Sequence, residues 1–112
     1  MTNTFDFKDG NGPVPAHQHS NGGGWVAATA TVAVTAYVGP DAVVYGNVLV
    51  SGDSCVSGNA CVYGNARVSG DALVYGNARV FDYALVSGNA IVSGNAQVYG
   101  YAAVSGDDQK SS

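Results

Sequence analysis

A valine recurs at every sixth position from Val26 to Val104, and this period restricts the fold more than any other feature of the chain. A small residue, usually alanine, stands two positions before nearly every valine, and two positions after it usually comes glycine followed by Asn or Asp. The repeating unit is therefore Ala-x-Val-(Ser/Tyr)-Gly-(Asn/Asp). A short unit repeated this often predicts a solenoid, in which each unit packs against its neighbours. The fourteen valines are Val26, Val32, Val38, Val44, Val50, Val56, Val62, Val68, Val74, Val80, Val86, Val92, Val98 and Val104.

Each unit is predicted to form one short strand and one corner. In Ala-x-Val-Ser the alanine and the valine are two residues apart, so a strand points both of them to one face. Glycine tolerates positive φ and Asn or Asp bonds its own backbone, so Gly-Asn and Gly-Asp turn the chain. Gly-Asn is also a hairpin signal. A hairpin meander, however, does not require the same inward pair in fourteen successive units, whereas a parallel β-solenoid does.

A longer period gives the number of strands in each coil. The residue after the valine is aromatic at Tyr45, Tyr63, Phe81 and Tyr99 and is serine at Ser51, Ser69, Ser87 and Ser105, and both sets advance by eighteen residues. Eighteen residues are three units, so residues eighteen apart are expected to stack on adjacent coils about 4.8 Å apart. The prediction is an all-β, single-stranded parallel β-solenoid with just under five triangular coils over residues 25–107.

The residues on either side of the repeat are expected to have different roles. Residues 1–24 are predicted to be an N-terminal arm or cap, and residues 108–112 a mobile polar tail. An open solenoid end exposes unpaired strand edges and core side chains. The apolar residues that are predicted to cover this end are Phe5, Phe7, Val14 and Trp25.

An aliphatic residue at the first of six positions, with a small residue at the fifth, resembles the hexapeptide-repeat, left-handed β-helix superfamily. Its best-known members are trimeric acyltransferases. The motif Gly-Asn-Ala-x-Val has a more specific resemblance to bacterial proteins that are assigned as transferases from these repeats, and to small prophage proteins. The resemblance covers about three quarters of the chain and implies a left hand and a homotrimer. Glycine falls two after the valine here, whereas the family motif places Gly, Ala, Glu or Asp one after it, so the corners are expected to differ.

Composition narrows the classes of partner. The chain has 112 residues and a net charge of −4, which favours one small domain. Only Arg67 and Arg79 are basic within the repeats, so nucleic-acid binding is not expected. The sequence has no apolar run long enough for a membrane span, and Met1-Thr2-Asn3 does not open a signal peptide. A cytoplasmic location is expected, in the host cytoplasm if the protein is encoded by a phage.

The cysteines and histidines give weak signals for chemistry. Cys55 and Cys61 occupy x positions of consecutive units and should project from different faces, so an internal disulfide is not expected. They are interpreted as small fillers, with a metal or redox pair as the alternative. His17 and His19 are weak metal candidates, because His-x-His on an extended segment places both rings on one side, but no third ligand is evident. No cofactor is predicted.

One outer face of the predicted prism is a candidate ligand surface. Its residues are the aromatic row Tyr45, Tyr63, Phe81 and Tyr99, with Arg79 beside it and Tyr83 and Tyr101 at its margin. An aromatic row stabilises stacked strands by itself. The functional alternative is a flat strip that stacks a planar ligand or a sugar, with Arg79 holding an anionic group.

Another outer face is a candidate oligomer interface. The outward residues on it are Tyr37, Cys55, Leu73, Tyr75 and Ile91. An outward apolar stripe on a small protein usually marks an interface. The resemblance implies three prisms around a three-fold axis, which would form a closed homotrimer.

Three classes of function stay open. The leading hypothesis is a non-catalytic, oligomeric solenoid that binds a small ligand or a protein partner, as a sequestering (sponge) protein of the phage type would. The second class is a structural spacer or a fibre-tip assembly module. The third is a hexapeptide-repeat acyltransferase, which needs a general base that is usually a histidine. No repeat contains a histidine or a substrate loop, so an enzyme is the less favoured reading.

Overall fold

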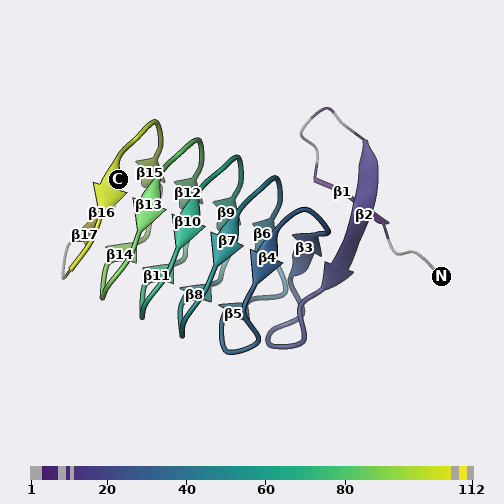
Figure 1. The fold of residues 1–112 in the computed structure, drawn as a ribbon, viewed down its shortest axis with the longest axis horizontal. Helices are drawn as coiled ribbons and strands as arrows, with labels where there is room; N and C mark the ends of the chain where they lie inside the picture. The colour runs from purple at the N-terminus through teal and green to yellow at the C-terminus, as the bar shows by residue number, and fades with distance from the viewer. Residues whose placement is uncertain (1–3, 8–9, 11, 107–108, 111–112) are drawn as a thin grey trace.

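The computed structural model describes residues 4–7, 10, 12–106 and 109–110, and these residues form short β-strands and no helix (Figure 1). The strands are β1 (Thr4–Asp6), β2 (Pro13–Gln18), β3 (Trp25–Ala27), β4 (Thr31–Val32), β5 (Tyr37–Val38), β6 (Val43–Val44), β7 (Leu49–Val50), β8 (Cys55–Val56), β9 (Cys61–Val62), β10 (Arg67–Val68), β11 (Leu73–Val74), β12 (Arg79–Val80), β13 (Leu85–Val86), β14 (Ile91–Val92), β15 (Gln97–Val98), β16 (Ala103–Val104) and β17 (Gln109–Lys110). Most strands are two residues long, because a corner, usually one with glycine, follows each valine closely.

Three parallel sheets form the sides of the solenoid. The first sheet contains β3, β6, β9, β12 and β15, the second contains β4, β7, β10, β13 and β16, and the third contains β5, β8, β11, β14 and β17. Paired residues are eighteen apart, as in Arg67 with Leu85 and Val68 with Val86. This register confirms the predicted parallel solenoid of about five three-sided coils.

The interior is a column of valine and alanine. Every repeat valine from Val38 to Val92 is fully buried, and the residue two positions before it, usually alanine, is buried as well. Ser54 takes the alanine position in one unit and is also buried, with its hydroxyl donating to the Ser51 carbonyl oxygen at 2.8 Å. The inward pair predicted from the sequence is therefore the core, and nearly identical layers fill it without large side chains.

The corners stack as regularly as the sides. Gly76 has φ +72, and a Cβ added to it would lie 2.9 Å from the backbone nitrogen of Gly94 in the next coil. Only glycine fits such a corner without strain or movement. At the corner between the third and first sheets, Asn59 donates to Asn77 at 3.5 Å and Asn77 donates to Asn95 at 3.3 Å.

The N-terminal arm extends the first sheet. β1 and β2 form an antiparallel hairpin, and β2 pairs antiparallel with β3 (Figure 1). Phe5 stacks on Trp25 with ring centroids 4.8 Å apart, and Phe7 lies in the same small apolar cluster. The cluster lies on the outer face of the first sheet, because it includes the outward residues Val43 and Tyr45 rather than the core valines. The hairpin thus covers both an edge and part of a face.

The loop after β2 covers the edge of the third sheet. The Val38 N–H donates to the Asn21 carbonyl oxygen, and the Gly24 N–H donates to the Val38 carbonyl oxygen, both at 3.0 Å. At the other end of the chain, β17 pairs in register with β14, so strand pairing extends past residue 107, where the solenoid was predicted to end. The rest of the predicted tail, at residues 108, 111 and 112, lies outside the described residues.

Candidate functional site

The predicted aromatic row is a continuous ladder on the outer face of the first sheet. Tyr45, Tyr63, Phe81 and Tyr99 stack with centroid distances of 5.0, 5.0 and 5.4 Å. Phe7 of the arm adds a fifth ring, 4.8 Å from Tyr45. Within the ladder, Tyr45, Tyr63 and Phe81 are half-buried. The ladder stabilises the sheet, and its use as a ligand surface stays a prediction.

Arg79 belongs to this same face and already has a partner there. It forms a hydrogen bond with the Tyr63 side chain. Burial raises the pKa of the Tyr63 phenol, and the charge and hydrogen bond of Arg79 lower it in part. Burial likewise raises the pKa of the Cys61 thiol, and the Arg79 charge again opposes the shift. The guanidinium of Arg79 is therefore part of the packing of the first sheet.

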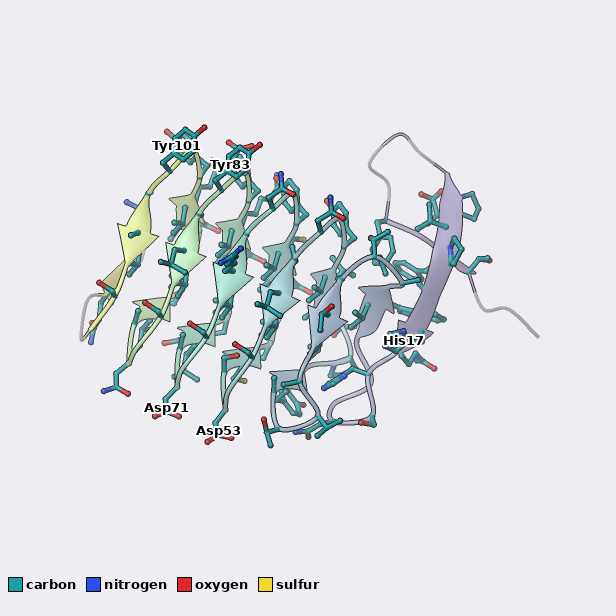
Figure 2. All side chains as sticks on the ribbon, in the orientation of Figure 1. His17, Asp53, Asp71, Tyr83 and Tyr101 are labelled. Atoms are coloured by element: carbon teal, nitrogen blue, oxygen red, sulfur yellow. The ribbon has the colours of Figure 1, made fainter. Side chains whose placement is uncertain are left out.

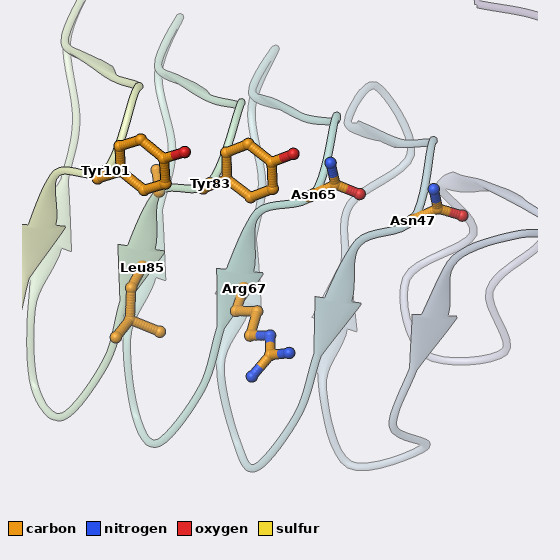
Figure 3. A pocket seen from close by; sticks show the side chains of 7 residues that line it. Asn47, Asn65, Arg67, Tyr83, Leu85 and Tyr101 are labelled. Atoms are coloured by element: carbon orange, nitrogen blue, oxygen red, sulfur yellow. The ribbon is translucent and has the colours of Figure 1, made fainter.

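Two tyrosines stand out at the corner between the first and second sheets. One residue of each coil takes the outermost position there, and these residues form the corner row Asn47, Asn65, Tyr83 and Tyr101 (Figure 3). Tyr83 and Tyr101 stack with centroids 5.2 Å apart and an angle of 6° between the rings. Their exposed fractions are 56% and 86%. Figure 2 shows both side chains projecting from the body of the solenoid.

A groove of about 520 Å³ lies beside this row, on the side of the second sheet (Figure 3). The residues that line the corner groove are Asn47, Asn65, Arg67, Tyr83, Ala84, Leu85 and Tyr101. Arg67 and Leu85 are opposite each other on β10 and β13. The floor of the groove is thus formed by one cationic and one aliphatic side chain, and its wall by amides and phenols.

The sequence interpretation paired the two tyrosines with Arg79, whereas the structure places Arg67 beside them. Sequence reasoning selected neither Arg67 nor the two asparagines. The signal in the sequence that indicates Arg67 is its spacing from the corner. The outward x residue of each unit comes two positions after a corner residue, as Arg67 comes after Asn65 and Leu85 after Tyr83. Corner row and second sheet therefore share one surface.

The side chain of Arg67 forms no ion pair and no hydrogen bond within the described part of the chain. Asp82, the acidic residue just before Tyr83, interacts with other groups. Its Oδ2 accepts a hydrogen bond from the Gly100 N–H at 3.1 Å, and its charge acts on Tyr63 of the first sheet. The groove therefore carries an uncompensated positive charge on a protein whose net charge is −4.

The backbone at this corner is also unusual. Asp82 has φ +61, and it is the one non-glycine with positive φ among the described residues. Asp tolerates this conformation better than most residues but with some strain. The hydrogen bond to Gly100 offsets part of that cost, because it joins this corner to the next one. The corner that presents Tyr83 thus differs from the repeat in both side chain and backbone.

The candidate interface residues lie together on the third sheet. Tyr37 pairs with Cys55, and Leu73 pairs with Ile91. Tyr37 and Leu73 are each 37% exposed, and Tyr75 is 41% exposed. These residues form the outward stripe predicted from the sequence. Their role in an oligomer stays a prediction.

The two histidines lie in different surroundings. His17 is exposed on β2, whereas His19 is buried and its Nε2 lies 2.8 Å from the Ala36 carbonyl oxygen. Cys55 and Cys61 are free thiols on the third and first sheets. Among the described residues, no three His, Cys, Asp or Glu side chains are grouped closely enough to hold a metal ion. A search of the same residues finds no helix that could cross a membrane.

A second, more apolar pocket of about 320 Å³ lies between the arm and the first coils. The residues that line it are Phe7, Val14, Pro15, Ala27, Ala28, Thr29, Tyr45 and Gly46. None of these described lining residues is charged. This pocket is a seam between the hairpin and the solenoid, and the Thr29 hydroxyl in its lining already donates a hydrogen bond to the Gly46 carbonyl oxygen.

Three-sided coils of three six-residue units, stacked in register, define a parallel β-solenoid of the hexapeptide-repeat kind. Within it, residues 60–74, 72–88 and 84–100 match the family model of the YdcK β-solenoid repeat. The chain is therefore a β-solenoid repeat protein, and its central repeats are similar to those of the YdcK type. No curated protein and no solved structure shows significant similarity to it. The matched segment includes Arg67, Tyr83 and Leu85 of the corner groove.

Proposed function

We propose that the protein is a non-catalytic binding solenoid and that it holds a small anionic, ring-bearing molecule in the corner groove. The observation that carries this proposal is the stacked, exposed pair Tyr83 and Tyr101 beside the unpaired Arg67. Aromatic side chains and arginine are the residues that most often dominate binding surfaces. The proposal places them together on one groove.

Packing within the fold does not explain the two tyrosines. The same corner holds Asn47 and Asn65 in the preceding coils, and the solenoid continues there without change of register. Tyr101 buries little of its surface, so it contributes little hydrophobic stabilisation. Exposed aromatic rings rimmed by polar groups are instead typical of a binding site.

The groups along the groove are suited to holding a ligand. A guanidinium presents several N–H donors in a fixed fork and binds carboxylate or phosphate with two parallel hydrogen bonds. The amides of Asn47 and Asn65 both donate and accept, and the phenols add two hydroxyls. Leu85 supplies apolar contact to a ring. A protein that binds without turnover acts by sequestering or presenting its ligand, which agrees with the sponge hypothesis.

The first test is native mass spectrometry of gently purified protein, which detects a retained small molecule by its extra mass. The variant is Tyr83→Asn with Tyr101→Asn, which restores the residue found at Asn47 and Asn65. The matched control is Tyr75→Ser, since Ser57 and Ser93 occupy the same position in the adjacent coils of the third sheet.

We expect the extra mass to be lost in the double variant and kept in the control. NMR shifts induced by added ring-bearing carboxylates should cluster on Arg67 and Leu85. A spacer or assembly module would show neither retained mass nor saturable shifts at the groove, and that result would contradict the proposal.

A further inference from the structure

We infer that the ligand of the corner groove is a short, linear, acidic saccharide that lies along the solenoid axis. The inference rests on the proposed function, because it names the chemical class of ligand for that site. Its basis is the direction of the groove, the spacing of its rings and its single charge.

The groove runs from coil to coil and not around one coil. The corner row takes one residue from each of four successive coils, at Asn47, Asn65, Tyr83 and Tyr101. Adjacent strands are about 4.8 Å apart, so the row is about 14 Å long. A site of this shape favours an elongated ligand with a repeating unit over a single compact molecule.

The spacing within the row is that of stacked sheet strands. The ring centroids of Tyr83 and Tyr101 are 5.2 Å apart, which is close to the advance of one pyranose unit in an extended saccharide. Consecutive sugar rings can therefore contact consecutive phenol rings. The negative face of an aromatic ring attracts the weakly positive C–H groups on a sugar face. Since Tyr101 is 86% exposed, a longer chain can continue past it.

The polar groups suit the rim of a sugar ring. Hydroxyl groups on neighbouring carbons both donate and accept hydrogen bonds, and the Asn47 and Asn65 amides offer both kinds of partner. Arg67 lies on the second sheet, below the corner row and under Tyr83 in the view of Figure 3. One sugar carboxylate can bind the guanidinium bidentately while the adjacent sugar rings contact the tyrosines.

The charge distinguishes an acidic saccharide from a nucleic acid. Arg67 is the single cationic side chain among the described residues that line the groove. Binding of a nucleic-acid backbone requires several cations, because each neutralised phosphate needs its own partner. A chain with one carboxylate in every two sugars places one charge at Arg67 and neutral groups on either side. Charge complementarity thus selects a sparsely charged polymer.

The test is isothermal titration of the full chain with two tetrasaccharides of equal length. One alternates glucuronic acid and N-acetylglucosamine, and the other contains N-acetylglucosamine alone. We expect the acidic tetrasaccharide to bind at least tenfold more tightly than the neutral one, because a charge-assisted bidentate pair provides about this discrimination. Affinity should fall sharply when the acidic ligand is shortened to a single glucuronic acid.

Three variants assign the binding to the groove. Arg67→Gln should weaken the acidic tetrasaccharide about tenfold and leave the neutral one unchanged. Arg79→Gln, the same change on the first sheet, should alter neither affinity. Tyr83→Asn with Tyr101→Asn should abolish both, while circular dichroism shows that the solenoid is intact.

Equal affinity for both tetrasaccharides, or an acidic preference that survives Arg67→Gln, would overturn the inference. Failure to bind the acidic tetrasaccharide, when native mass spectrometry still shows a groove-dependent extra mass, would overturn the saccharide alone and leave the proposed function standing. Failure of both measurements would overturn both proposals.

Discussion

At most corners a single glycine allows the chain to turn and also allows the next coil to approach. Gly76 and Gly100 share nearly the same positive φ, +72 and +65. They differ in surroundings: a Cβ on Gly76 would meet the Gly94 backbone nitrogen at 2.9 Å and its carbonyl oxygen at 3.1 Å, whereas a Cβ on Gly100 would meet nothing within 4 Å. The two positions therefore separate the cost of conformation from the cost of stacking.

We predict that Gly100→Ala lowers the free energy of unfolding by about 1–2 kcal/mol, the cost of a left-handed conformation for a residue with a Cβ. Gly76→Ala should cost distinctly more, because the backbone of the next coil must also move. Thermal and denaturant unfolding of the two variants measure the difference. Equal destabilisation would show that the coils do not approach as closely as the structure indicates.

At the scale of the element, the first sheet combines an aromatic ladder with titratable groups. Arg79 lies opposite Cys61 in the strand register, and it contacts Tyr63 as well. Burial raises the pKa of both the thiol and the phenol, so both are held neutral on this face. A group whose pKa is raised by folding stabilises the fold at neutral pH, and that contribution is lost as pH rises through its range.

We predict that the Cys61 thiol, titrated by thiolate absorbance in the Cys55→Ala variant, has a pKa above its ordinary value. Adding Arg79→Gln should raise this pKa further, because the variant removes the positive charge that opposes the shift. The melting temperature should fall as the solution is made alkaline. Arg67→Gln is the control, since Arg67 lies on another sheet. A Cys61 pKa that responds equally to both arginine variants would contradict this account of the face.

At the scale of the molecule, the described residues form a prism of 42 × 27 × 19 Å with two apolar outer surfaces. Leu73 on the third sheet and Leu49 on the second are 37% and 39% exposed, and both occupy the x position of their units. Tyr37, Cys55 and Ile91 adjoin Leu73 along its sheet, whereas Thr31 and Arg67 flank Leu49. The third sheet is therefore the more continuous apolar surface.

We propose a homotrimer that associates through the third sheet. Leu73→Lys should convert the trimer to monomers in native mass spectrometry, because it places a charge in the middle of the apolar stripe that the trimer would bury. Leu49 has nearly the same exposure as Leu73 and occupies the same position of its unit, so Leu49→Lys is the matched control and should leave the trimer intact. A monomeric wild-type protein, or dissociation by the second variant and not the first, would refute this interface.

The solenoid could be predicted from the sequence because each position of the unit has one environment throughout. Val68 and Val86 are eighteen residues apart, opposite each other and equally buried. The residue type at one position of the unit therefore indicates whether that position is buried in every coil. The arm has no such period. The pairing of β2 with β3 and the place of Phe7 in the ladder depend on tertiary packing, and no local pattern encodes them.

The candidate site could be predicted only in part for a related reason. Tyr83 and Tyr101 were visible as departures from the repeat, and their stacking followed from the spacing of eighteen. Which arginine lies beside them depends on the direction in which the corner side chains point, and that direction is a property of the folded corner. Asp82, with its positive φ, changes this corner in a way that the unit consensus does not describe.

The hydrogen bonds between coils run along the length of the prism, as from the Arg67 N–H to the Ala84 carbonyl oxygen at 3.0 Å and from the Leu85 N–H to the Ala102 carbonyl oxygen at 3.0 Å. A pulling force along that axis would break the hydrogen bonds between neighbouring coils one coil at a time. Each coil released adds eighteen residues of slack, up to about 60 Å of extended chain. Under tension the protein would therefore lengthen in equal steps, one step for each coil that unfolds.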